Sequence, residues 1–209
     1  MDPDPIELTR QTYNRIAAQF ANVNAVMPEQ VAEMATRLIA QIQPDERILD
    51  LGCGPGRDLA WFVAHGTRVT GADLSAGMLV ESWRIVNVGL CQMDFRRLGF
   101  ANGSFSGVWC NAALLHLPKR EVPAALAEIR RILSPGGCFF ASVQQGYGES
   151  IEINPLNGAQ RFFARYQAPE MIELLENAGF SVLNQEIQQD NTRPECGWIW
   201  HETVRKESN

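Results

Sequence analysis

The sequence predicts an α/β fold in which a mostly parallel sheet is covered by helices on both faces. Three observations lead to this class. From Arg47 onward, short apolar runs alternate with helix-like stretches, as in chains that cross back and forth over a parallel sheet. The first apolar run leads directly into a glycine-rich turn. Acidic residues then follow the first three runs, whose carboxyl ends share one edge of such a sheet.

Two helices are expected before the first strand, at Ile6–Phe20 and Pro28–Ile42, the second with proline in its first turn and an end before Pro44. The expected strands are Arg47–Leu51, Arg68–Ala72, Leu90–Met93, Phe105–Asn111, Gly137–Val143, Ser181–Gln185 and Trp198–Val204. The helices expected between them are Arg57–His65, Ala76–Arg84, Arg120–Leu133 and Pro169–Ala178. Residues 134–137, Ser-Pro-Gly-Gly, are expected to stop a helix and turn the chain.

The stretch Gln144–Gly158 is rich in glycine and has little periodicity, so it is predicted to be a long loop. A ligand of an open parallel sheet lies outside the carboxyl ends of the strands, and the sheet alone leaves it facing water. We therefore expect the first 24 residues and this loop to close over the ligand. Tyr13 would reach in from one side, and Tyr147 and Glu149 from the other.

Composition sets further limits. A chain of 209 residues with 45% apolar content predicts one domain, residues 1–209. The apolar runs are too short for a membrane span and the first residues do not resemble a signal peptide, so we expect a cytoplasmic protein that binds no membrane. Five scattered cysteines suggest neither a metal site nor a disulfide framework. A net charge of −6 with dispersed basic residues argues against nucleic acid and favours a small-molecule partner.

The strongest motif is the run Ile48–Gly56, in which a buried-strand pattern leads into three closely spaced glycines and then a helix. A dinucleotide-binding G-x-G-x-x-G run starting at Gly52 would need glycine at position 57, where this chain has Arg57. The carboxylate of Asp50 would repel a pyrophosphate but attract an ammonium or a sulfonium group. S-adenosylmethionine (SAM) carries both cations, so the motif favours SAM as the cofactor.

Two further acids follow later strands. Asp73 comes about 20 residues after the glycine turn, where a carboxylate can accept hydrogen bonds from both ribose hydroxyls. We expect Asp73→Ala to weaken SAM binding, and Asp73→Asn to weaken it less because one acceptor remains. Asp94 follows the third strand and is placed to accept a hydrogen bond from the adenine amino group. The alternative for these acids is that they only cap helices or turns.

In their order and spacing, these motifs resemble those of the class I SAM-dependent methyltransferases that modify small molecules, and the resemblance extends over nearly the whole chain. It implies a Rossmann-like sheet of seven strands whose last strand is antiparallel. It also divides the chain into a helical cap (1–45), a SAM-binding core (46–143), a lid or acceptor loop (144–168) and a C-terminal part with a helix and strands (169–209). Ser106 stands where many members have Asp, a position usually remote from the methyl group.

The resemblance also implies where SAM would lie. The methionine end is assigned to Asp50 and the glycine turn, the ribose to Asp73, and the adenine to Asp94 and Phe95. Backbone carbonyls near Cys110 and Asn111 would face the methionine portion. Tyr13 matches a tyrosine that related proteins often place against the methionine carboxylate, with ordinary packing as the alternative. The expected cofactor residues are Tyr13, Asp50, Gly52, Cys53, Gly54, Asp73, Leu74, Asp94, Phe95, Cys110 and Asn111.

Two other groups are candidates for the acceptor side. His116 follows the fourth strand, and an imidazole there is suited to take a proton near neutral pH, although a structural role is the alternative. The segment Arg161–Tyr166 combines arginines with aromatic residues. It predicts either recognition of an anionic or aromatic acceptor or a half-solvated segment whose aromatic residues enter the core.

The predicted reaction is an in-line transfer of a methyl group from SAM to an O, N, S or C atom of a small molecule, with S-adenosylhomocysteine (SAH) as the product. Signatures of base-amino methylation, cytosine methylation, protein arginine methylation and metal-assisted catechol chemistry are absent after the fourth strand. The alternatives are a non-catalytic SAM-binding sensor or partner module, and an enzyme that uses SAM for another transfer. A nicotinamide-dependent oxidoreductase is disfavoured by Arg57 and Asp50.

Overall fold

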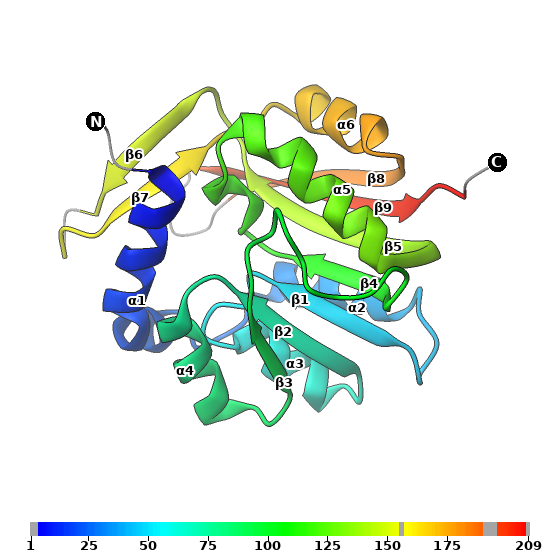
Figure 1. The fold of residues 1–209 in the computed structure, drawn as a ribbon, viewed down its shortest axis with the longest axis horizontal. Coiled ribbons are helices and arrows are strands. Elements are labelled where there is room, and N and C mark those ends of the chain that lie inside the picture. The colour runs from blue at the N-terminus through cyan, green and yellow to red at the C-terminus, as the bar shows by residue number, and fades with distance from the viewer. Residues whose placement is uncertain (1–3, 155–156, 190–195, 208–209) are drawn as a thin grey trace.

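A seven-stranded sheet runs through the molecule in the order β3-β2-β1-β4-β5-β9-β8 (Figure 1). The computed structural model describes residues 4–154, 157–189 and 196–207, so residues 1–3 and 155–156 of the expected covering segments lie outside the described residues. The first five strands in this order run parallel, and β9 is antiparallel to both β5 and β8. The strands are β1 (Arg47–Leu51), β2 (Arg68–Asp73), β3 (Gly89–Gln92), β4 (Phe105–Cys110), β5 (Leu133–Gln144), β8 (Phe180–Gln189) and β9 (Gly197–Arg205). The predicted sheet with its antiparallel last strand is confirmed.

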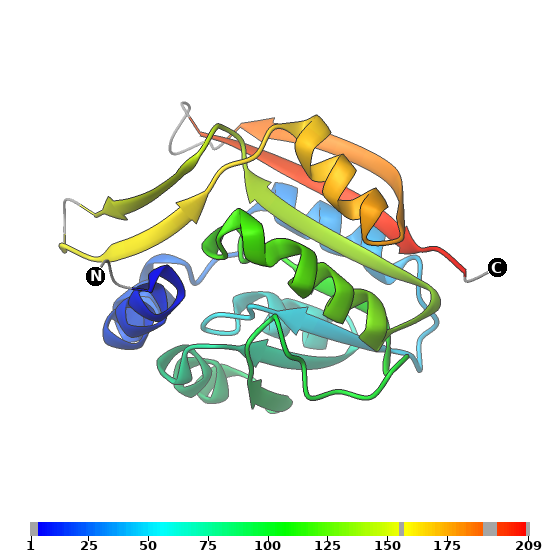
Figure 2. The ribbon, with the colours of Figure 1, turned by 45° about the horizontal axis from the view of Figure 1, so that its top comes forward.

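Helices cover both faces of this sheet (Figure 2). On one face lie α5 (Val122–Ile132) and α6 (Ala168–Asn177), and on the other α2 (Glu29–Ile39) and α3 (Arg57–Ala64). The fourth helix, α4 (Ala76–Ile85), packs beside β2 and β3. Successive residues of a strand point to opposite faces. Leu49 and Leu51 of β1 therefore join the core under α5, whereas Ile48 joins the core under α3.

The first helix, α1 (Pro5–Val23), lies across the carboxyl ends of the strands, between α4 and a two-stranded hairpin (Figures 1 and 2). Its start is fixed locally, since the Asp4 side chain accepts a hydrogen bond from the N–H of Ile6 at 3.0 Å and proline occupies the first turn. The helix is therefore placed to cover the edge at which the motif residues gather.

The hairpin occupies most of the segment that was expected to be a loop, and this part of the prediction was wrong. Strand β6 (Glu149–Ile153) pairs antiparallel with β7 (Gln160–Ala164). In β6 the isoleucines are exposed and the polar residues between them are half-buried, the reverse of the usual strand pattern. The polar-apolar alternation covers only Ser150–Ile153, between a glycine-rich stretch and Pro155, which is too short a signal to predict a strand.

The turn expected at residues 134–137 is an irregularity inside β5. Phe105 pairs with Leu133 and Gly107 with Cys138, so four residues on β5 face one on β4. The helix ends before them, at Ile132, as the Pro-Gly pair predicts, but the chain continues as a strand.

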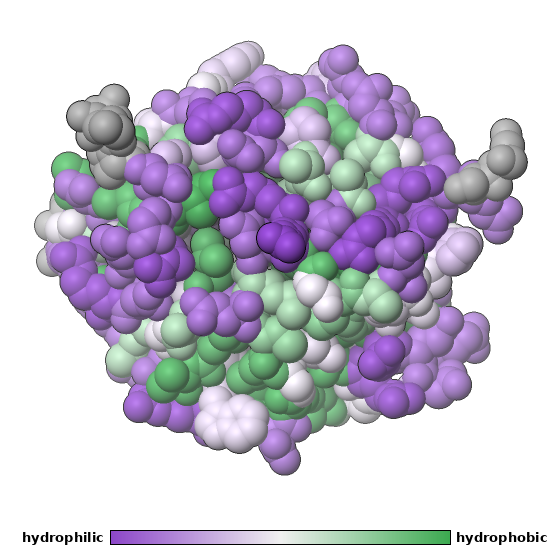
Figure 3. Space-filling model, in the orientation of Figure 1, coloured by the Kyte–Doolittle hydropathy of each residue, from purple (hydrophilic) through white to green (hydrophobic). Residues whose placement is uncertain are grey.

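The surface is mixed. Hydrophobic side chains reach it over α4 and β3 (Figure 3), where Val80, Trp83 and Ile85 of α4 are exposed. No helix among the described residues combines the length and the apolar character needed to cross a membrane.

Candidate cofactor and acceptor site

A glycine turn joins β1 to α3. Gly52, Gly54 and Gly56 have positive φ angles of 78°, 53° and 90°, a conformation that side chains other than glycine rarely adopt. The N–H of Gly52 donates to the carbonyl of Ala72 at 2.7 Å, which fastens the turn to β2. A Cβ on Gly52 would lie 2.3 Å from the Cβ of Ala113, but a Cβ on Gly54 would meet no atom within 4 Å. The turn is therefore packed tightly at Gly52 and open at Gly54.

Asp73 at the end of β2 ties this turn to the start of α4. Its Oδ2 accepts a hydrogen bond from the N–H of Gly54 at 2.9 Å, and its Oδ1 accepts one from the N–H of Ser75 at 2.7 Å. Burial raises the pKa of this carboxyl group, and the backbone N–H groups act in the opposite direction. Each carboxylate oxygen keeps a second lone pair. Asp73 lines the cavity described below, so it is able to accept hydrogen bonds from two ligand hydroxyls.

Helix α1 is held at this edge by polar contacts. Asn14 Oδ1 accepts hydrogen bonds from the Ser75 hydroxyl at 2.8 Å and from the N–H of Gly77 at 2.9 Å, which caps α4 from outside. Nearer its start, Thr9 Oγ1 accepts a hydrogen bond from the N–H of Phe162 in β7 at 3.0 Å. The helix is thus attached to α4 on one side and to the hairpin on the other.

On the other side of the glycine turn, a chain of hydrogen bonds fixes the end of β4. One oxygen of Asp58 accepts from Trp109 Nε1 at 2.9 Å and from Asn111 Nδ2 at 3.0 Å. The Ser142 hydroxyl donates to Asn111 Oδ1 and accepts from the N–H of Ala112, both at 2.8 Å. Ala112 has φ of 52°, a strained value for a residue with a Cβ, costing about 1–3 kcal/mol. The chain of bonds holds this strained backbone against the cavity.

Tyr13, His116 and Arg161 meet opposite the glycine turn. His116 Nδ1 lies 2.7 Å from the carbonyl oxygen of Phe162, and its Nε2 lies 2.8 Å from the Tyr13 hydroxyl. Because a carbonyl can only accept, Nδ1 carries the proton and Nε2 accepts from Tyr13. Burial lowers the pKa of His116 to about 4 and raises that of Tyr13, so both are neutral at pH 7. Arg161 donates to the Tyr13 oxygen at 3.1 Å.

A cavity of about 610 Å³ connects these groups. Of the residues expected at the cofactor or in catalysis, those that line it are Tyr13, Gly52, Cys53, Gly54, Asp73, Leu74, Asp94, Phe95, Asn111 and His116. The sequence-based list therefore describes much of one continuous site. Asp58, Ser75, Ser142 and Arg161 also line the cavity. Of these, Arg161 belongs to the segment Arg161–Tyr166, whose aromatic residues make it a candidate for the acceptor side. The only sequence signal for Asp58 is its place in the first turn of the helix after the glycines.

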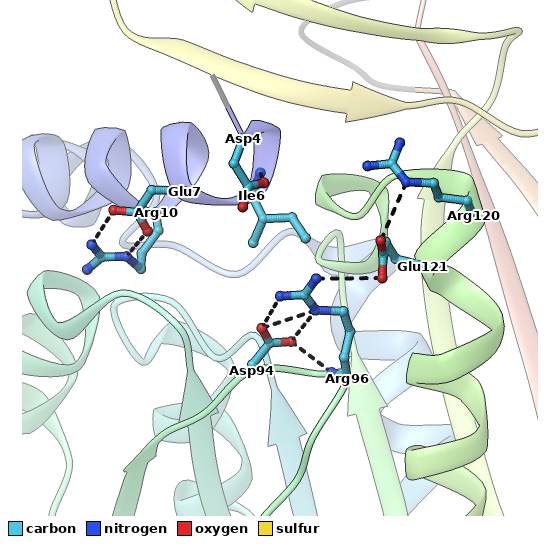
Figure 4. A network of polar contacts seen from close by, with 8 residues as sticks. All are labelled: Asp4, Ile6, Glu7, Arg10, Asp94, Arg96, Arg120 and Glu121. Carbon is cyan, nitrogen blue, oxygen red and sulfur yellow. Dashed lines mark hydrogen bonds and ion pairs between the residues drawn. The ribbon is translucent and has the colours of Figure 1, made fainter. Parts of the chain in front are cut away.

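Asp94 lies at the mouth of the cavity and is paired with Arg96 at 2.6 Å, and Arg96 also reaches Glu121 at 3.6 Å (Figure 4). The hydrogen bonds from Arg96 lower the pKa of Asp94. Helix α1 places Ile6 and Arg10 on the opposite side of the opening (Figure 4). Since Arg96 already uses both carboxylate oxygens, the assignment of Asp94 to the adenine amino group stays a prediction.

Two expected cofactor residues, Asp50 and Cys110, are not among the residues that line the cavity. Asp50 is 2% exposed, lies on the same face of β1 as Ile48, and its Oδ2 has no hydrogen-bond partner. Burial raises its pKa well above the ordinary value. Cys110 is fully buried in the core under α5. Their roles at the methionine end stay predictions.

Comparisons with known proteins show that the chain is similar to methyltransferases. A family model described as a methyltransferase domain matches residues 48–137, which include the glycine turn, Asp73 and His116. The chain is also 36% identical over 132 residues to the malonyl-[acyl-carrier protein] O-methyltransferase of Erwinia billingiae. That alignment covers 61% of this chain and 47% of the relative. The chain spans about half the length of several curated relatives that it matches.

Solved structures share the fold. The 1,6-didemethyltoxoflavin-N1-methyltransferase of Burkholderia thailandensis, solved with 1,6-didemethyltoxoflavin and SAH, matches with a TM-score of 0.79 and 24% identity, covering 99% of this chain and 92% of that one. The [4+2]-cyclase SpnF matches with a TM-score of 0.76 and 17% identity over 100% of this chain and 98% of that one. At these identities the likeness shows the fold alone.

Proposed function

We propose that this chain is a SAM-dependent methyltransferase and that it transfers the methyl group of SAM to an O, N, S or C atom of a small-molecule acceptor. The observation that carries the proposal is the glycine turn, which is open to the cavity at Gly54 and tied to Asp73. A fold alone does not establish an activity, so the argument rests on these contacts.

The residues present fit SAM. The cavity volume of about 610 Å³ lies in the range of small-molecule sites. Asp73 would hold the ribose hydroxyls through the free lone pairs of its carboxylate. The apolar side chains of Leu74, Met78 and Phe95 line the cavity near it and would pack against the adenine. The cradle at Gly54 would receive the methionine portion, beside Asn111.

Bound SAM supplies a methyl group on a positively charged sulfur. The chain contributes binding, orientation and exclusion of water, since methyl transfer by in-line displacement needs no protein nucleophile. Helix α1 covers the edge of the site. His116 is a weak candidate for a base because its Nε2 already accepts from Tyr13 and burial lowers its pKa to about 4.

The names of the similar proteins support a small acceptor. One is named for a malonyl group on acyl-carrier protein and another for 1,6-didemethyltoxoflavin, and several are named O-methyltransferases. We propose a small-molecule or carrier-bound acceptor for this chain, no nucleic-acid partner, and a cytoplasmic location.

Isothermal titration calorimetry with SAM, SAH and NAD tests the cofactor assignment. We expect SAM and SAH to bind and NAD not to bind. Incubation with SAM carrying a deuterated methyl group and pooled metabolites then tests transfer, with mass spectrometry detecting SAH and a labelled product. Asp73→Ala is the matched control and should reduce labelling at a SAM concentration that just saturates the wild type. NAD binding tighter than SAM binding would refute the assignment.

The alternative is a protein that binds the cofactor without methyl transfer, because the fold alone does not establish turnover and a [4+2]-cyclase shares it. In this reading the chain binds SAM or SAH without consuming it. The same metabolite pools are incubated with a control methyltransferase that labels compounds in them. If this chain leaves those compounds unlabelled and the SAM intact, the result supports the alternative over methyl transfer.

A further inference from the structure

Arg161 of β7 is held rigidly at the wall of the cavity. Its guanidinium carbon lies 5.6 Å from the centre of the Tyr13 ring and 5.1 Å from the centre of the Phe163 ring. One terminal nitrogen donates to the Tyr13 oxygen at 3.1 Å. Its Nε is buried and has no hydrogen-bond partner among the residues that the structure describes. Two aromatic contacts and one hydrogen bond therefore fix a planar cation that still has unused N–H groups.

The other charged groups of the cavity are arranged differently. Arg10 pairs with Glu7 at 2.6 Å, and Arg57 pairs with Asp58 at 2.6 Å. Among the arginines that line the cavity in the described part of the chain, Arg161 alone has no carboxylate within ion-pair distance. A buried or half-buried cation without a counterion is costly unless a ligand supplies the negative charge.

The neighbouring side chains cannot supply that charge. The Tyr13 proton is donated to His116 Nε2, so the Tyr13 oxygen serves Arg161 only as a neutral acceptor. Glu152, on the paired strand β6, forms an ion pair with Arg165 instead. The glycine turn and Asp73, which are assigned to SAM, contact each other and not Arg161.

We propose that Arg161 binds a carboxylate of the methyl acceptor, so that the substrates of this protein are small molecules carrying a carboxylate group. A guanidinium presents two parallel N–H groups that match the two oxygens of a carboxylate. The rings of Tyr13 and Phe20, whose centres lie 5.4 Å apart, line the cavity with Arg161 and accommodate an apolar body attached to that carboxylate. This inference rests on the proposed methyl transfer and names the acceptor class for the same cavity.

The test uses matched acid and amide probes on the full chain saturated with SAH. Benzoate is compared with benzamide, and hexanoate with hexanamide, by ligand-observed NMR titration. We expect each acid to bind about 10- to 100-fold more tightly than its amide, as charge-assisted hydrogen bonds imply. Arg161→Gln should lose this preference. Arg165→Gln is the control, since Arg165 directly follows the same strand but pairs with Glu152 and does not line the cavity.

SAH affinity separates the two proposals. Failure of the wild type to bind SAH would remove the proposed function itself. If SAH binds but the acids have no advantage over the amides, or if Arg161→Gln retains that advantage, the acceptor assignment is overturned. A tenfold loss of SAH affinity in Arg161→Gln would mean that the guanidinium binds the carboxylate of the cofactor's amino-acid portion. This result would also overturn the acceptor assignment. If Arg161→Gln does not fold, Arg161→Lys is measured in its place. We expect this variant to prefer the acids over the amides less strongly than the wild type does, and the preference to decline with added salt. A preference equal to that of the wild type contradicts the proposal.

Discussion

Replacing Asp73 with asparagine is the sharpest test of the cofactor side. Both carboxylate oxygens accept backbone N–H groups, from Gly54 at 2.9 Å and from Ser75 at 2.7 Å. An asparagine side chain has one oxygen and one NH2 group, so in either orientation a donor faces a donor. The sequence predicts Asp73→Asn to be milder than Asp73→Ala, and the two backbone donors remove that advantage.

The magnitude follows from the bonds that are lost. The variant gives up one charge-assisted hydrogen bond to a backbone N–H and one acceptor for the ribose. Hydrogen bonds to a charged group contribute about 1.5–3 kcal/mol. We expect the affinity for SAH to fall by roughly 10- to 150-fold, with Asp73→Asn no better than Asp73→Ala.

Calorimetric titration of SAH at 25 °C measures this, with circular dichroism to confirm folding. Asp45→Asn is the control because Asp45 is exposed, does not line the cavity, and undergoes the same chemical change. An affinity of Asp73→Asn within twofold of the wild type would show that the carboxylate does not organise the turn. An asparagine variant that binds ten times better than the alanine variant would refute the donor conflict.

Three other substitutions follow from the structure. Gly52→Ala should lower SAH affinity more than tenfold in a calorimetric titration, because its Cβ would lie 2.3 Å from that of Ala113 in a backbone with φ of 78°. Gly77→Ala should loosen α1, because its Cβ would lie 2.8 Å from the Cα of Asn14, and faster amide hydrogen exchange in residues 5–23 would report this. His201→Leu should flatten the pH dependence of stability, measured by urea unfolding between pH 4 and pH 6.5. Burial lowers the pKa of His201 from 6.5 to about 4, so its contribution to stability is complete above pH 6.5 and is lost as the pH falls toward 4. Up to about 1.4 kcal/mol per pH unit of the slope should disappear.

Each of these has its control. Gly66→Ala is the control for Gly52→Ala. Gly66 has a positive φ of 75°, but an added Cβ would meet no atom within 4 Å, so this variant separates backbone strain from the clash at Gly52. Unchanged exchange in α1 of Gly77→Ala would mean that the helix is not seated by this contact. His65→Leu changes an exposed histidine, and an equal change of slope in this variant would contradict the role of burial at His201.

The sequence predicts the sheet and the glycine turn well because both depend on local signals. The glycines need their positive φ, and Asp73 must follow the strand that pairs with β1. Asp50 shares a face of β1 with Ile48, which lies in the core under α3, and it is not among the residues that line the cavity. Its role at the methionine end stays a prediction.

The acceptor side is harder to predict since it is built from segments far apart in the chain. Tyr13, His116 and Arg161 come from α1, from the turn after β4, and from β7. No short-range pattern brings them together, and the hairpin that carries Arg161 has an inverted polarity. The hydrogen bond of His116 Nδ1 to a backbone carbonyl of β7 is likewise invisible in the sequence.

Helix α1 carries neighbouring residues that serve different halves of the cavity. Asn14 fastens it to α4 beside Asp73, and Tyr13 fastens it to His116 and Arg161. One rigid helix cannot release one contact and keep the other in place. The cofactor and acceptor sites are thus linked through the position of this helix. If bound SAH raises the affinity for the acceptor by holding the helix in place, the bound acceptor must raise the affinity for SAH by the same factor. We therefore expect the two ligands to bind cooperatively through the helix, beyond any direct contact between them, and Gly77→Ala to reduce that cooperativity.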